Sequence, residues 1–165
     1  KNEHTGTKED FYYEGGIADY VSYLASTRSS PYPSKPFYFE NKSGKVNVQV
    51  SFQYSEDDDE TIYAFANNIN TADGGTHLSG FKTSITRVIN QFSRSLNIIK
   101  EKEPNLTGED IREGIVAIIS VRLPQPQFEG QTKGKLGSAH KFPRVLKGKL
   151  LEEWQGFIAN YKNTF

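Results

Sequence analysis

The sequence predicts an α+β sandwich, and three of its features point to this class. Apolar and polar residues alternate over 46–54, as in a half-buried strand. A helical apolar stripe runs over 76–96, and a nearly continuous apolar run over 115–119 is typical of a strand buried on both faces. With the weaker patterns around them, the predicted order is helix, three strands, long helix, short helix, strand and terminal helix.

The residues before the alternating strand predict one helix and one short strand. Residues 1–10 are polar, and we expect a flexible segment there. A helix is predicted over 16–26, because apolar residues recur at spacings of four and three: Ile17, Val21 and Leu24. Residues 29–34 are rich in serine and proline and end that helix in a loop, after which 37–39 predict a short strand.

An acidic run separates the next two predicted strands. We expect 61–66 to be the antiparallel neighbour of 46–54, with the five carboxylates of 56–60 between them. A solvated hairpin loop is the favoured interpretation of this run, and a cation site is the alternative.

The second half of the chain alternates polar loops with apolar elements. A polar loop over 67–75 leads into the long helix, whose face opposite the apolar stripe carries Lys82, Arg87 and Arg94. Thr107 is a typical N-cap for a short helix before the central strand. A basic loop with several glycines follows over 129–137. An amphipathic terminal helix is marked by Leu146, Leu150, Leu151, Trp154, Phe157, Ile158 and Tyr161.

Charge is balanced overall but unevenly distributed. The 165 residues contain 20 Lys and Arg against 20 Asp and Glu. Residues 1–60 carry 6 basic and 11 acidic side chains, whereas 61–165 carry 14 and 9. Residues 130–151 contain basic side chains and no Asp or Glu; the basic residues are Lys133, Lys135, Lys141, Arg144, Lys147 and Lys149. Zero net charge argues against a strong autonomous binder of nucleic acid.

Several kinds of chemistry are excluded or disfavoured. The chain has no cysteine, which excludes disulfides, thiol chemistry and cysteine-based zinc sites. It shows no phosphate-binding GxxxxGK[ST] loop and no metalloprotease or serine-hydrolase motif. We expect His4 and His140 to be structural or surface residues, and His77 to order the glycine loop beside it. An enzyme that acts alone is therefore disfavoured.

Two loops carry residue types that could contact a ligand. Asp73-Gly74-Gly75-Thr76-His77 holds two glycines at the start of a helix, where a tight turn is the simplest interpretation. Gln131-Thr132-Lys133-Gly134-Lys135 places lysines on a flexible loop, where they could meet a phosphate or simply be solvated.

The order and spacing of these loops match a known family. The segments Tyr13-Glu14-Gly15-Gly16, Asn67-Asn68-Ile69-Asn70-Thr71, Asp73-Gly74-Gly75-Thr76-His77, Thr107-Gly108-Glu109-Asp110 and Gln131-Thr132-Lys133 resemble the transducer domain of type IIA DNA topoisomerases. The likeness is closest to the B subunit of bacterial DNA gyrase, with topoisomerase IV next. It covers about 11–138, which would be the transducer domain, and leaves 139–165 as a linker and amphipathic helix.

The resemblance implies a fold and a role in coupling. The fold is a two-layer sandwich like domain two of ribosomal protein five, with a left-handed βαβ crossover. In the family, an adjacent ATPase domain holds ATP with Mg²⁺, and the lysine of the Gln-Thr-Lys loop contacts the γ-phosphate, assisted by the glutamine. The resemblance thus assigns Gln131 and Lys133 to nucleotide binding, Lys133 as the catalytic phosphate sensor. No metal ligand is expected in this chain.

The resemblance also implies partners. Basic residues of the long helix face the transported double-stranded DNA in the family, which assigns Lys82 and Arg87 to DNA. A cleavage-core domain and a gyrase A-like subunit would complete a cytoplasmic, ATP-hydrolysing topoisomerase that supercoils DNA. As a fragment of that enzyme, the chain should be monomeric, free of cofactor and inactive by itself, with no membrane partner. The alternatives are a free-standing nucleic-acid-binding module of the same fold and a small-molecule kinase of that fold.

Overall fold

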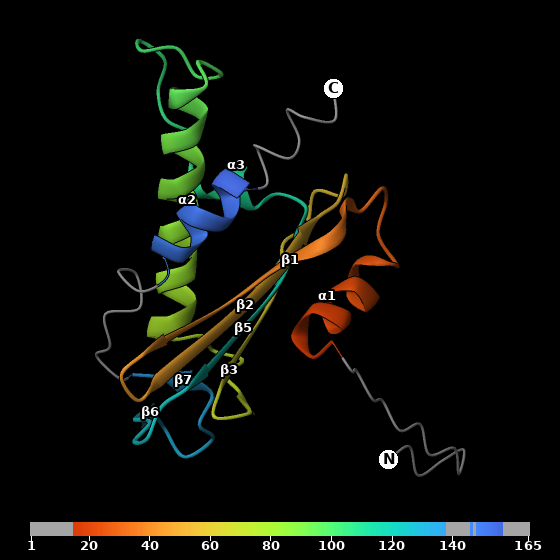
Figure 1. The fold of residues 1–165 in the computed structure, drawn as a ribbon. Helices are drawn as coiled ribbons and strands as arrows, with labels where there is room; N and C mark the ends of the chain where they lie inside the picture. Colours follow the sequence, from red (N-terminus) through yellow and green to blue (C-terminus); the bar gives the residue numbers. More distant parts are fainter. Residues whose placement is uncertain (1–14, 138–145, 147, 157–165) are drawn as a thin grey trace.

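The computed structural model describes residues 15–137, 146 and 148–156 (Figure 1). A five-stranded sheet has the order β1-β2-β5-β3-β4, and a separate two-stranded hairpin pairs β6 with β7. The strands are β1 Tyr32–Ser43, β2 Val46–Tyr54, β3 Thr61–Ala66, β4 Ile69–Asn70, β5 Ile115–Arg122, β6 Phe128–Glu129 and β7 Lys135–Leu136. The helices are α1 Ile17–Ala25, α2 Thr76–Ser95 and α3 Gly108–Arg112. The predicted segment 1–10, His4, His140, Lys141, Arg144, Lys147, Phe157, Ile158 and Tyr161 lie outside the described residues.

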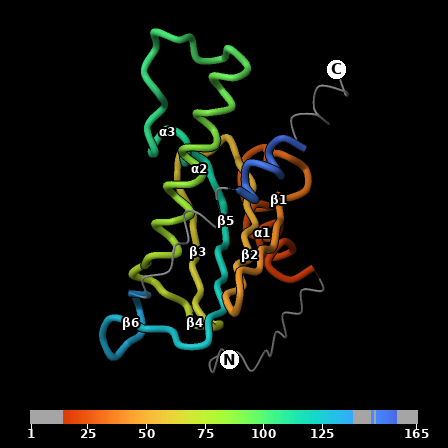
Figure 2. Tube along the Cα trace, turned by 60° about the vertical axis from the view of Figure 1, so that its left-hand side comes forward, coloured from red at the N-terminus to blue at the C-terminus, as the bar shows by residue number. Residues whose placement is uncertain are grey.

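The central strand of the sheet is β5, as its apolar run predicts. Its first seven residues are buried, and it pairs antiparallel with β2 and parallel with β3. The prediction that 61–66 is the direct neighbour of 46–54 is therefore wrong, because β5 lies between these strands (Figure 2). A continuous apolar run is typical of a strand whose two faces are both covered, and β5 has this position in the middle of the sheet, with α2 on one face and α1 on the other.

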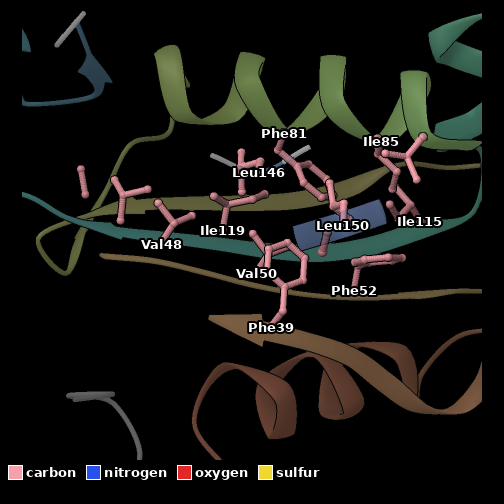
Figure 3. Close-up of a cluster of buried hydrophobic side chains, with 14 of the residues drawn as sticks. Phe39, Val48, Val50, Phe52, Phe81, Ile85, Ile115, Ile119, Leu146 and Leu150 are labelled. Carbon is pink, nitrogen blue, oxygen red and sulfur yellow. The ribbon is translucent and has the colours of Figure 1, made fainter. Parts of the chain in front are cut away.

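The main core lies between one face of the sheet and α2. Phe81 and Ile85 project from α2 onto alternate residues of β2 and β5 (Figure 3). The helical residues 148–156 add to the same core, where Leu150 and its neighbour Leu146 are fully buried. The helical apolar stripe therefore has the role that its spacing predicts, which is to cover the sheet.

A smaller core covers part of the opposite face. Val21 and Ala25 of α1 pack on Val116 and Ile118, the β5 residues that point away from α2. Figure 1 shows α1 and α2 on opposite sides of the sheet. The α+β class is confirmed, and α1 adds a partial layer to the sandwich.

The first strand is longer than predicted. It starts at Tyr32 rather than at residue 37, so part of the predicted loop 29–34 is strand. Prolines at positions 33 and 36 argue against a strand in the interior of a sheet. They are tolerated in β1 because it is an edge strand, where a missing backbone N–H need not remove a hydrogen bond to a neighbouring strand. The register with β2 shifts between Tyr32 and Phe37, which accommodates the prolines.

The parallel strands β3 and β5 are joined through α2 and α3, which forms a βαβ unit. Thr107 caps α3 as predicted: its hydroxyl accepts from the Asp110 N–H at 3.2 Å, and the Asp110 carboxylate accepts from the Thr107 N–H at 2.8 Å. The left hand of the crossover stays a prediction. Within the described residues, no helix has the length and apolarity needed to cross a bilayer.

Candidate functional site

The loop 131–133 lies at the tip of the β6–β7 hairpin. Gln131, Thr132 and Lys133 are all exposed. The strands below them are tied by an ion pair of 2.8 Å between Lys135 Nζ and Glu129 Oε2, which raises the pKa of Lys135 through its hydrogen bond to Glu129. Lys133 has a φ of 55°, an uncommon conformation for a residue with a side chain. Within the described part of the chain, Lys133 makes no ion pair, so its ammonium is available to a ligand.

The structure brings the two predicted loops together. The Asp73 N–H donates to the Gly134 carbonyl at 2.8 Å, and the Leu136 N–H donates to the Gly74 carbonyl at 3.1 Å. Gly75 and Leu136 also form a parallel β-bridge. Figures 1 and 2 both show the hairpin at the end of the sheet where α2 begins. The 73–75 turn thus holds the loop that carries Gln131 and Lys133.

His77 orders this turn from inside the protein, as the sequence predicts. Its side chain is fully buried in the first turn of α2, with Nε2 at 3.0 Å from the Thr71 hydroxyl. That hydroxyl donates to the Ala64 carbonyl at 2.9 Å, so it must accept from His77, which fixes the neutral tautomer with the proton on Nε2. Burial lowers the pKa of His77 to about 4.

This burial makes stability depend on pH. The unfolded chain binds a proton at His77 below about pH 6.5 and the folded protein does not until about pH 4, so acidification favours unfolding. When the pH falls from 7 to 5, we expect protonation of His77 in the unfolded chain to lower the free energy of unfolding by about 2 kcal/mol. Denaturant titrations at both pH values should show that loss, and His77→Gln should lack it. The variant keeps His4 and His140, so the difference isolates His77; equal losses in both proteins would contradict the assignment.

Lys82 lies in an ion-pair network rather than free on the surface of α2. Its Nζ is 2.5 Å from Glu60 Oε1, and Arg112 Nε is 2.7 Å from Glu60 Oε2. Partial burial raises the pKa of Glu60, but the hydrogen bonds from Lys82 and Arg112 outweigh it and hold that pKa below its usual value. Glu60 therefore links α2 to α3 and neutralises part of the charge that Lys82 would offer to DNA.

Arg87 has a different setting. Its side chain is exposed and makes no ion pair with the described residues. Arg94, the third cation of the helix, instead holds the connection that follows α2: it donates to Asn105 Oδ1 at 2.8 Å and to the carbonyl of Glu103 at 2.8 Å. Of the three predicted cations of α2, only Arg87 is both exposed and free of a carboxylate within the described chain.

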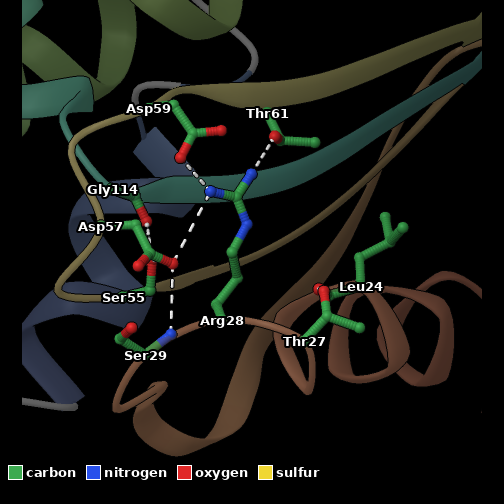
Figure 4. A network of polar contacts seen from close by, with 9 residues as sticks. All are labelled: Leu24, Thr27, Arg28, Ser29, Ser55, Asp57, Asp59, Thr61 and Gly114. Carbon is green, nitrogen blue, oxygen red and sulfur yellow. Dashed lines mark hydrogen bonds and ion pairs between the residues drawn. The ribbon is translucent and has the colours of Figure 1, made fainter.

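Three carboxylates of the acidic run 56–60 are paired within the fold: Asp57 and Asp59 with Arg28, and Glu60 with Lys82 and Arg112. Arg28 contacts Asp57 at 3.7 Å and also bonds Asp59 and Thr61 (Figure 4). These contacts tie the segment that follows α1 to the connection between β2 and β3. The run is not the loop of a hairpin, because β5 lies between β2 and β3. Within 15–137, 146 and 148–156, no three His, Asp or Glu side chains are grouped to hold a metal ion. The structure thus favours neutralisation by cationic side chains of the chain itself over a cation site.

Comparison with known proteins decides the family. The family model for DNA gyrase B matches residues 16–164. The chain belongs to the DNA gyrase B family. The DNA gyrase B protein of Halalkalibacterium halodurans is 54% identical over 145 residues, which are 88% of this chain and 22% of that protein. The DNA gyrase B protein of Bacillus mycoides is 50% identical over 164 residues, 99% of this chain and 40% of that protein.

A solved gyrase B structure has the same fold. The 43K ATPase domain of Thermus thermophilus gyrase B, in complex with an aminocoumarin, matches with a TM-score of 0.81 at 37% identity over 94% of this chain. The chain covers 42% of that structure, less than half of its length. The match over nearly the whole chain leaves the free-standing nucleic-acid module and the small-molecule kinase without support.

One member of the site, Glu60, was not predicted from the sequence. It pairs with Lys82 of α2 and with Arg112 of α3. Glu60 is 22 positions before Lys82 and 52 before Arg112. The available signal was only the excess of acid at 56–60, which does not say which cations it meets.

Proposed function

We propose that this chain is the transducer region of a type IIA DNA topoisomerase subunit of the gyrase B family. In this proposal, it couples ATP binding and hydrolysis in an adjacent ATPase domain to DNA strand passage and supercoiling. The observation that carries the proposal is the exposed Lys133 on a hairpin tip whose backbone is hydrogen-bonded to the 73–75 turn. The region itself hydrolyses nothing, because it supplies contacts to one phosphate and not a complete site.

The chemistry of the loop suits a γ-phosphate. A lysine ammonium is a compact point charge with three donors, and a fixed backbone reduces the entropy lost when it binds. Gln131 adds an amide donor two residues away. Loss of the γ-phosphate removes the interaction that Lys133 makes only with the triphosphate, so the hairpin can then change position. Lys133 and Gln131 would thus report the state of the nucleotide.

Mg²⁺ would enter with ATP and be held mainly by the ATPase domain. The described residues are consistent with Mg²⁺ being held by the other domain: they contain no cluster of three or more carboxylate or histidine side chains that could hold a metal ion, and they offer a lysine to the phosphate. Magnesium bound to the triphosphate neutralises part of its charge during phosphoryl transfer. The residues of this chain would bind and orient the γ-phosphate at Lys133 Nζ.

Arg87 is the residue that we propose for the DNA-facing surface, with Lys82 in a secondary role. We expect Arg87→Ala in the full-length subunit to weaken DNA binding and to lower the slope of log affinity against log salt by about 1. Lys149→Ala is the matched control, because Lys149 is paired with Glu152 and Glu153 at 3.0 and 3.3 Å. Equal salt slopes for wild type and Arg87→Ala, measured by fluorescence anisotropy, would remove the DNA contact.

The whole function is tested by reconstitution. The full-length subunit is combined with a gyrase A-type subunit, relaxed circular DNA and ATP with Mg²⁺. We expect negative supercoils that depend on ATP and on both subunits, and no ATP hydrolysis by the 165-residue chain alone. ATP turnover without any change in DNA topology would contradict the proposal, and so would decatenation without supercoiling.

A further inference from the structure

We infer that the 73–75 turn is the positioning element for Lys133, and that Gly75 is its essential residue. The inference rests on the proposed function, and it adds to that function the means by which the phosphate-sensing loop is held and is connected to α2. The turn touches no nucleotide in this account. It acts through the backbone of the β6–β7 hairpin.

Hydrogen bonds clamp the hairpin on the side that follows the tip. The acceptor for the Asp73 N–H is the carbonyl of Gly134, the residue immediately after Lys133. The acceptor for the Leu136 N–H, two residues further, is the carbonyl of Gly74. Leu136 is fully buried in the main core, so this side of the hairpin is fixed both by hydrogen bonds and by packing. The position of Lys133 is therefore set by the turn and not by the hairpin alone.

Only glycine fits at position 75. A Cβ there would lie 2.5 Å from the Leu136 carbonyl oxygen and 2.7 Å from its nitrogen, which are backbone atoms that cannot rotate away. The backbone angles, φ 139° and ψ −172°, also belong to a region that is essentially restricted to glycine. Any side chain at this position must push β7, and with it the loop 131–133, away from the turn.

The same turn begins the long helix. Gly75 is the N-cap of α2, and its carbonyl accepts the first helical hydrogen bond from the Ser79 N–H at 3.0 Å. His77 anchors this first turn through Thr71. The hairpin tip, the turn and α2 thus form one unit joined by backbone hydrogen bonds. A displacement of Lys133 on loss of the γ-phosphate is passed directly to the helix that carries Lys82 and Arg87.

The test uses the full-length subunit and the variant Gly75→Ala. We expect the Asp73 and Leu136 amides to exchange with deuterium at least about tenfold faster, because both donate across the displaced contact. We expect kcat for ATP to fall about 10- to 100-fold through misplacement of Lys133. In a Lys133→Ala background, Gly75→Ala should cause no further loss. Gly44→Ala is the control, since Gly44 has a φ of +60° but no heavy atom within 4 Å of its Cβ position.

A milder variant covers the case in which Gly75→Ala does not fold. Gly74 has a φ of +80°, which a residue with a side chain adopts only with strain, and the nearest atom that a Cβ there would meet is Leu78 Cδ2 at 3.2 Å. We expect Gly74→Ala to speed exchange of the Leu136 amide, which donates to the Gly74 carbonyl, and to lower kcat by less than Gly75→Ala does. Unchanged amide exchange in both variants, or losses of kcat that multiply with that of Lys133→Ala, would overturn the positioning role. Normal turnover of Lys133→Ala alone would instead overturn the proposed phosphate contact, and amide exchange would still decide whether the turn holds the hairpin.

Discussion

Lys133→Ala in the full-length subunit should lower kcat for ATP hydrolysis about 100-fold, the loss typical of removing one donor to the charge that develops in a transition state. The side chain is exposed and makes no ion pair within the described residues, so the unfolding free energy should change by less than about 0.5 kcal/mol. ATP-dependent supercoiling should fall with the ATPase rate, because strand passage is driven by the nucleotide cycle.

Lys135→Ala is the matched control for this prediction. Lys135 lies in the same hairpin, is also an exposed lysine and is paired with Glu129. Its removal costs a surface ion pair, which is worth about 0–1 kcal/mol of stability, and should leave turnover close to wild type. Steady-state ATPase assays with both variants compare a free and a paired ammonium two positions apart. Equal rates for the two variants would contradict the phosphate contact.

Phe52→Ala should cause the largest loss of stability, about 3–5 kcal/mol, which is a large part of the roughly 5–15 kcal/mol typical of a domain. The Phe52 ring is buried at the centre of an aromatic cluster. Its centroid lies 4.8 Å from that of Phe37, 6.1 Å from that of Phe81 and 6.3 Å from that of Trp154. The substitution would leave a cavity where β1, β2, α2 and the helical residues 148–156 meet.

Trp154 is the only tryptophan of the chain, so its fluorescence reports unfolding of this core directly. Phe52→Leu keeps most of the volume and should cost less than about 1.5 kcal/mol. Ile98→Ala removes an apolar side chain that is 69% exposed and should change stability by no more than about 0.5 kcal/mol. A loss below about 1 kcal/mol for Phe52→Ala would show that Trp154 and α2 do not close the core over this residue.

Local patterns predicted most of the elements of the fold. Strand β2, the long helix and the buried strand β5 each have a clear hydrophobic period, and each lies where that period places it. The neighbours of β3 could not be predicted in this way, because the insertion of β5 depends on contacts more than 50 positions apart in the chain. The start of β1 was missed because prolines are tolerated at an edge, and sequence alone does not say which strand is the edge.

The candidate site was predictable to a different extent. The residue types of the loop 131–133 permitted a phosphate contact but did not favour it, and the family resemblance selected it. The docking of that loop on the 73–75 turn depends on backbone hydrogen bonds that no side-chain pattern encodes. The ion pair of Lys82 with Glu60 depends on how β3 and α2 lie relative to each other in the fold. The sequence pattern therefore predicts a basic face on α2, whereas within the described chain only Arg87 is both exposed and free of a carboxylate.

The most direct test of the central claim is the reactivity of the Lys133 amine in the full-length subunit. The subunit is treated with an amine-modifying reagent in the presence of ADP or of a non-hydrolysable ATP analogue, and labelling of each lysine is measured by mass spectrometry. Lys135 in the same hairpin is the internal control. We expect the triphosphate analogue to protect Lys133 and ADP not to protect it, with labelling of Lys135 unchanged. Equal labelling of Lys133 with both nucleotides would contradict the γ-phosphate contact.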